Sequence, residues 1–148
     1  MFSSLAVALD PVGNVSLALQ VAILFLLILG LPFVRGSNTK KNLMRHGYLT
    51  AFAVILHTVL IFVVMVPTFV SGVAGLGATG LLDILNVWSH VILGTVAEVL
   101  GVILVAVWLR YGPSRMMCAR LKKWMVPTFV IWVISLVGGS IVHILGMI

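Results

Sequence analysis

The feature that most constrains the fold is a set of four long apolar segments separated by short polar connections. They cover residues from about 15–34, 47–70, 84–109 and 124–147. Each is long enough to cross a hydrocarbon core of about 30 Å as a helix, which rises about 1.5 Å per residue. Backbone amides find no water inside lipid, so each segment must satisfy its own hydrogen bonds. The chain is therefore predicted to be an all-α, polytopic membrane protein, with four transmembrane helices in an antiparallel bundle.

The composition agrees with this prediction and excludes several classes of protein. Of 148 residues, 62% are hydrophobic and only 8% are charged, whereas about a quarter of the residues in a soluble domain are charged. Four spans leave no room for a soluble domain, so residues 1–148 form a single transmembrane domain. No long basic block lies outside the apolar segments, which argues against a nucleic-acid partner. The lipid bilayer is the expected environment.

The charged residues predict the orientation of the chain. All nine Lys and Arg residues lie in the connections 35–45 and 110–123. The connection between the second and third spans carries no cation and ends in Asp83, and the N-terminal segment contributes only Asp10. Because basic loops stay in the cytoplasm, we expect a plasma-membrane protein with both basic loops cytoplasmic and both termini outside.

Two ionisable residues are expected near the middle of the membrane. A charged or titratable side chain there costs about 2 to 3 kcal/mol and usually faces the bundle interior. By residue count, His57 in the second span and Glu98 in the third lie at a similar depth. A hydrogen bond between them is the cheapest way to satisfy both, so we predict a buried polar pair. A proton relay or a metal site is the alternative. His46 lies at the inner interface, where it can reach water.

Two further histidines are candidates for binding a cofactor. His90 and His143 lie near the outer ends of the antiparallel third and fourth spans, so they share a depth. Each has a glycine one turn deeper on the same helix face, Gly94 and Gly139 respectively. A porphyrin needs small residues beside its axial histidines, which predicts haem b at this site. The same glycines would also serve plain helix packing.

Copper is the alternative ligand for these histidines. The outer side offers no Arg or Lys to pair with haem propionates. Met65 and Met147 lie near the level of His90 and His143, and a thioether combined with imidazole suits copper, particularly Cu(I). Histidines at the interface without any ligand are another possibility, and a function linked to protonation is the remaining one.

The hexapeptide MVPTFV occurs twice, at residues 65–70 and 125–130. The first copy ends its span and the second opens its span, so the copies do not mark a duplicated helix pair. We expect Pro67 to end a helix and Pro127 to lie in a first turn, where a missing amide hydrogen costs least.

The last third of the chain resembles a known family. A Ser-His-Ile-like opening of the third helix and an Ala-Arg-Trp-x-x-Pro-x-Trp-x-Tyr-Val-like opening of the fourth are typical of small four-helix membrane proteins linked to the assembly of haem-copper cytochrome oxidase. The matching residues are Ser89, His90, Trp124, Pro127 and Trp132.

The second span is also similar to this family, with one departure. Met44 and Phe52 match its His-Arg-x-x-Met-x-x-Ala-Phe stretch, but Asn42 and its neighbours stand where the family has its first histidine. The resemblance implies a role in maturing or supporting a terminal oxidase, at the step where haem or copper enters.

We therefore expect a small accessory or assembly subunit of a membrane-bound haem or copper oxidoreductase, with larger subunits of that complex as partners. Such a subunit is not itself an enzyme, and the chain contains no hydrolase motif. One alternative is a small b-type cytochrome that carries electrons. Another is a structural packing subunit without its own cofactor.

Overall fold

The computed structural model describes residues 11–35, 40–73, 81–112 and 114–144. Met147, Asp10 and the middle loop from 74 to 80 lie outside these ranges. The described residues form helices and no strand. The elements are α2 (Pro11–Arg35), α3 (Lys40–Leu60), the π-helix η1 (Ile61–Met65), α4 (Val66–Val73), α5 (Leu81–Tyr111) and α6 (Arg115–Ile144).

Four of the helical stretches are long and apolar enough to cross a membrane. The second runs without interruption from α3 through η1 into α4. This confirms the prediction of an all-helical chain with four candidate transmembrane helices. The stretches are Pro11–Phe33, Lys40–Ser71, Ile84–Tyr111 and Cys118–Ile141.

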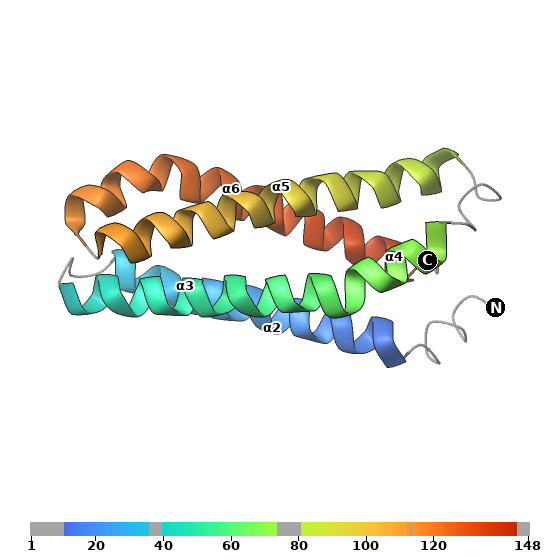
Figure 1. Cartoon of the computed structure of the whole chain (residues 1–148), viewed down its shortest axis with the longest axis horizontal. Coiled ribbons are helices and arrows are strands. Elements are labelled where there is room, and N and C mark those ends of the chain that lie inside the picture. The colour runs from blue at the N-terminus through green and yellow to red at the C-terminus, as the bar shows by residue number, and fades with distance from the viewer. Residues whose placement is uncertain (1–10, 36–39, 74–80, 113, 145–148) are drawn as a thin grey trace.

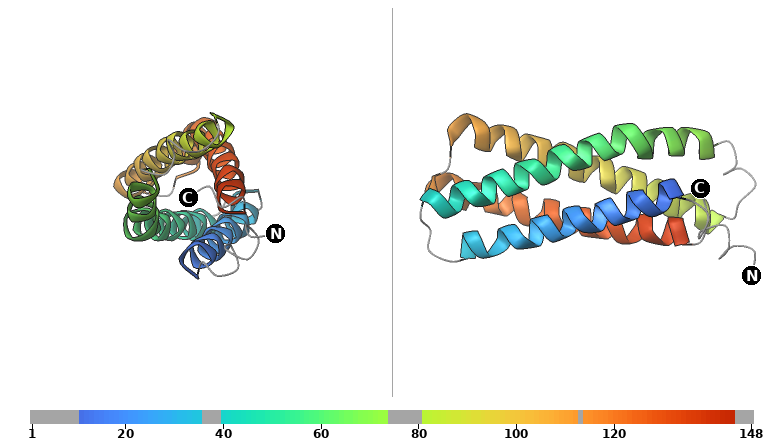
Figure 2. Two further views of the ribbon diagram at one scale, coloured as in Figure 1. Left: turned by 90° about the vertical axis from the view of Figure 1, so that its right-hand side faces the viewer. Right: turned by 90° about the horizontal axis from the view of Figure 1, so that it is seen from below.

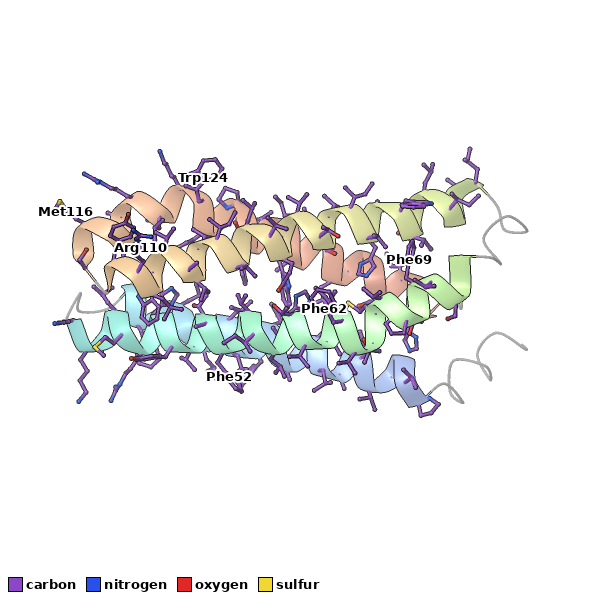
Figure 3. All side chains as sticks on the ribbon, viewed as in Figure 1. Phe52, Phe62, Phe69, Arg110, Met116 and Trp124 are labelled. Atoms are coloured by element: carbon purple, nitrogen blue, oxygen red, sulfur yellow. The ribbon has the colours of Figure 1, made fainter. Side chains whose placement is uncertain are left out.

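The helices pack as two antiparallel hairpins. One hairpin consists of α2 and α3 with its continuation α4, and the other of α5 and α6, and the two lie against each other along their length (Figures 1 and 2). The start of α2 and the end of α6 lie together, and we name this the terminal end. The opposite end, where α5 turns into α6, is the basic end, and Figure 3 shows Arg110 and Met116 there.

A narrow core of apolar side chains holds the two hairpins together. Small residues occur in this core: Ala53 of α3 and Ala97 of α5 are almost completely buried, and small side chains let helix backbones approach closely. The outward faces are apolar too, as expected for contact with lipid. Phe52 projects away from the bundle (Figure 3) and is 57% exposed. The core consists of Ile23, Ala53, Leu60, Ala97, Trp132 and Leu136.

Both prolines lie elsewhere in their helices than we expected. Pro127 is inside α6, because the basic segment from Arg115 onward is already helical. Pro67 does not end its helix, which continues to Val73. The ring of a proline clashes with the carbonyl four residues earlier, here that of Val63. The wider turns of η1 span this position and give the ring room. The expectations of an end-of-helix and a first-turn proline were therefore wrong.

Candidate functional site

The structure brings His57 and Glu98 together in the middle of the bundle. His57 lies in the last turn of α3, and its Nδ1 is 2.7 Å from Oε2 of Glu98 on α5. The side chains are only 7% and 14% exposed. The second carboxyl oxygen, Oε1, contacts the hydroxyl of Thr58. Both oxygens of this acid therefore have a polar partner, as burial requires.

Two members of this cluster, Thr58 and Trp132, were not predicted from the sequence. Thr58 also lies 2.9 Å from the carbonyl oxygen of Val54. The indole N–H of Trp132, on α6, is 3.4 Å from His57 Nδ1, and the two rings meet edge to face with centroids 5.3 Å apart. Thr58 could have been predicted from the sequence, because it is the residue next to His57. Nothing in the spacing of Trp132 pointed to this contact, which depends on how α6 packs against α3.

His90 is fixed against α6 through one ring nitrogen. Its Nδ1 lies 2.8 Å from the carbonyl oxygen of Ser135. Because a carbonyl only accepts, Nδ1 carries the hydrogen and donates it, which leaves the lone pair of the neutral imidazole on Nε2. The hydroxyl of Ser135 donates to the carbonyl oxygen of His90 at 3.1 Å. These two bonds join α5 to α6 at this level.

The glycines near His90 make room for side chains of the protein itself. A Cβ atom at Gly139 would lie 2.5 Å from Cε1 and 2.9 Å from Nδ1 of His90. At Gly94 it would lie 3.0 Å from the hydroxyl oxygen of Ser135. The space that we assigned to a porphyrin therefore holds the imidazole of His90 and the Ser135 hydroxyl.

His143 lies near the end of α6 and joins it to α2. Its Nε2 is 3.0 Å from Oδ1 of Asn14. An amide oxygen only accepts, so with Asn14 in this orientation Nε2 donates and Nδ1 keeps the lone pair. His90 and His143 thus share one property: an oxygen atom from a neighbouring helix lies within hydrogen-bond distance of one nitrogen of each ring.

Two cavities of about 110 Å³ each lie between the helices. The first is beside His57 and Trp132, and the second is nearer the terminal end beside His143. They are neighbours, since both are lined by the same group of residues: Gln20, Met65, Phe69, His90 and Val91.

The second cavity places three potential metal ligands around one space. His90, His143 and Met65 all line it. Met65 is the last residue of η1, so the π-helix lies directly at the cavity wall, as π-bulges at functional sites commonly do. Across the described ranges, no cluster of three or more His, Cys, Asp or Glu side chains could hold a metal. The donor set here is instead a mixed one, with two imidazoles and one thioether.

The residues at this site do not fit haem. Pockets for small organic ligands are typically about 300 to 1,000 Å³, far larger than either cavity of about 110 Å³. The space beside Gly94 and Gly139 is filled, as described above. A single metal ion has no such size problem, and imidazole nitrogen with thioether sulfur is a donor set that Cu(I) favours.

His46 lies apart from these residues, toward the basic end. Its Nδ1 is 3.1 Å from the carbonyl oxygen of Gly30 on α2, while its Nε2 is buried without a hydrogen bond. The access to water that we expected does not match a residue that is only 8% exposed. His46 therefore serves to hold α3 against α2.

Comparisons with protein families, with curated proteins and with solved structures gave no match to this chain.

Proposed function

We propose that this chain is a small accessory or assembly subunit of a membrane-bound haem-copper oxidoreductase, and that it holds one Cu(I) ion between His90, His143 and Met65. One observation carries the copper site: these three side chains line a single cavity. The two imidazoles come from α5 and α6 and the thioether from η1, so the ion would join both helical hairpins.

The orientation of the imidazoles supports this assignment. Metal-binding histidines almost always donate their other ring N–H to an oxygen, which fixes the ring and raises the basicity of the ligating nitrogen. His90 donates to the Ser135 carbonyl at 2.8 Å, and His143 pairs with the Asn14 amide oxygen at 3.0 Å. Each of the two proposed ligands thus has the oxygen partner that metal-binding histidines usually have.

The chemistry of the donors favours Cu(I) over harder cations. Thioether sulfur is a soft ligand that selects Cu(I), while oxygen donors select Mg²⁺ and Ca²⁺. The carboxylate of Glu98 contacts His57 and Thr58 and lines neither cavity. A neutral donor set of this kind would hold Cu(I) as a cargo for delivery to a partner's copper centre.

The resemblance to the oxidase-assembly family supports the choice of partner. His90 is one of the residues that carry this resemblance, and it is also a proposed ligand. By the positive-inside rule the basic end faces the cytoplasm of a plasma-membrane protein. Both termini and the copper site then lie toward the outer face of the membrane.

A copper titration tests the proposal. Detergent-purified protein is titrated anaerobically with Cu(I) against a chromophoric Cu(I) chelator. We expect one ion per chain, with binding weakened about 10- to 100-fold or more by H90A, H143A or M65L. The control is M116L, which removes an exposed methionine at the basic end. Equal affinities in the wild type and all three site variants would overturn the copper assignment.

The proposed partnership needs a separate measurement. The tagged chain is purified in mild detergent from its own membranes, and its companions are identified by mass spectrometry. Oxidase subunits in the eluate support the accessory role, and their absence overturns it. A visible spectrum of the chain alone separates the alternatives, since a Soret band supports the b-type cytochrome. If oxidase subunits co-purify but the chain binds neither copper nor haem, the result supports the structural packing subunit.

A further inference from the structure

The hydroxyl of Thr58 makes more contacts than its single hydrogen can serve. It lies 2.9 Å from the Val54 carbonyl and also contacts Oε1 of Glu98. A hydroxyl donates one hydrogen bond. If Thr58 donates to Glu98, the acid fits as a carboxylate. If Thr58 donates to Val54, the contact with Oε1 requires the hydrogen to come from Glu98, which is then a carboxylic acid.

The same ambiguity occurs at His57. Its Nδ1 faces Oε2 of Glu98 at 2.7 Å and the N–H of Trp132 at 3.4 Å. An indole N–H only donates. When Nδ1 carries hydrogen it donates to the carboxylate. When Nδ1 is bare it accepts from Trp132 and from the single hydrogen of a protonated Glu98 on Oε2, and Thr58 then donates to Oε1. The contact between His57 and Glu98 therefore fits two arrangements that differ in where the proton lies.

We propose that Glu98, together with His57 and Thr58, is a proton-binding site in the middle of the membrane, which exchanges protons with the terminal end through the two cavities. None of these three residues is a proposed copper ligand, although the second cavity is also the one that we assign to copper.

The relay balances in atoms and charge. It begins with Glu98 as a carboxylate and His57 neutral, with its hydrogen on Nδ1. A hydronium ion gives a proton to Nε2 of His57 and leaves water, and the Nδ1 hydrogen passes to Oε2 of Glu98 across the 2.7 Å contact. One N–H bond and one O–H bond form, while one N–H bond of the imidazole and one O–H bond of the hydronium break. The products are a carboxylic acid and a neutral imidazole, and one proton has entered.

Burial provides the reason to bind a proton here. A charged carboxylate in a membrane interior is costly, and a proton removes its charge. Glu98 does not line the first cavity itself but contacts His57, which does, and the other titratable side chain at this cavity is His90 on α5. The neighbouring side chains from α2 and α6, Gln20 and Trp132, do not titrate.

The cavities connect this site to the terminal end. His57 lines the first cavity, His143 lines the second, and they share a wall at His90 and Gln20. Ser16 and Thr68 add hydroxyls to the second cavity. Each volume of about 110 Å³ suffices for a few waters at about 30 Å³ apiece. Under this proposal, waters in the two cavities would carry protons between the polar side chains.

On the other side of Glu98 the helices are in contact. A Cβ atom at Gly101, nearly one turn toward the basic end, would lie 3.4 Å from Cγ2 of Val54. This spacing brings α3 and α5 together and leaves apolar atoms between them. Exchange from the terminal end is therefore favoured.

Infrared spectroscopy of the detergent-purified full chain tests the proton site. We expect the carbonyl band of a protonated carboxylic acid at some pH between about 5 and 8, a band that E98Q abolishes and E98D shifts. H57N is expected to change its pH dependence. The absence of any carboxylic acid band assignable to Glu98 over that range would overturn the proposal. E98D keeps the test valid if E98Q does not fold.

The route is tested by the rate at which this band shifts after transfer to D₂O. Thr68 lines the second cavity, while Thr128 lines neither, although both hydroxyls donate to the carbonyl four residues earlier at 2.8 Å. We expect T68L to slow the exchange by at least about tenfold, a barrier of about 1.4 kcal/mol, and T128L to leave it unchanged. Equal rates in both variants would overturn the route.

Discussion

Gly139 of α6 lies directly against the imidazole of His90, so closely that a methyl group at this glycine would be 2.5 Å from the ring carbon Cε1. This contact allows Nδ1 of His90 to reach the Ser135 carbonyl at 2.8 Å. The glycine therefore fixes the direction of the other ring nitrogen, the one that we assign to copper.

Two adjacent glycines give a matched test of this relationship. G139A is expected to push His90 away from α6 and to weaken Cu(I) binding about tenfold or more, because the hydrogen bond from His90 to the Ser135 carbonyl is lost. At Gly138 the nearest atom to a new Cβ is 3.8 Å away, so G138A should bind normally. Chelator competition on both variants measures the difference. Equal affinity in G139A and wild type would show that the His90 position is irrelevant to copper.

A second close contact governs stability at the basic end. A Cβ atom at Gly47 would collide with the indole ring of Trp108, whereas at Gly101 it would make an ordinary contact at 3.4 Å. Overpacking costs about 1 to 3 kcal/mol. We expect G47A to lower the free energy of unfolding in mixed micelles by this amount and G101A to change it much less. Similar losses in the two variants would contradict the packing described for Trp108.

The pair of His57 and Glu98 should behave as a unit. Removing one partner leaves the other buried without its hydrogen bond, which costs about 1 to 3 kcal/mol. We expect H57L and E98L each to destabilise the fold, and the double variant H57L/E98L to cost less than the sum of the two. Unfolding in mixed micelles across this double-mutant cycle measures the coupling. Strict additivity would mean that the 2.7 Å contact contributes nothing to stability.

The orientation of the chain can be measured with cysteine labelling. Cys118 lies near the start of α6 at the basic end, and Ser71 lies exposed near the end of α4. With the basic end in the cytoplasm, a membrane-impermeant maleimide should label Cys118 only after permeabilisation. In a C118S background, S71C should be labelled in intact cells. The reverse pattern would place the copper site at the cytoplasmic face.

Much of the fold was predictable because the bilayer leaves few alternatives. A long apolar segment in lipid must become a helix, and this argument needs no knowledge of side-chain packing. The depth argument for His57 and Glu98 relied on the same regularity, a constant rise per residue along two straight helices. It placed the two residues at one level, where the structure has them in contact.

What could not be predicted depends on contacts between helices. The sequence shows that Gly139 shares a face with His143, but not that the ring of His90 fills the space beside it. The acceptor for His90 is the backbone carbonyl of Ser135. Because every residue has a backbone carbonyl, the sequence does not identify this acceptor. The π-helix was not predicted because it accommodates Pro67 within a helix. Packing against the other helices lets that helix continue beyond the proline.

X-ray absorption at the copper K-edge of the Cu(I)-loaded protein tests the proposed copper site most directly, because it identifies the elements that bind the metal. We expect nitrogen ligands together with one sulfur ligand, and the sulfur contribution should disappear in M65L while remaining in M116L. A sulfur signal that survives in M65L, or a shell without nitrogen, would contradict a site built from His90, His143 and Met65.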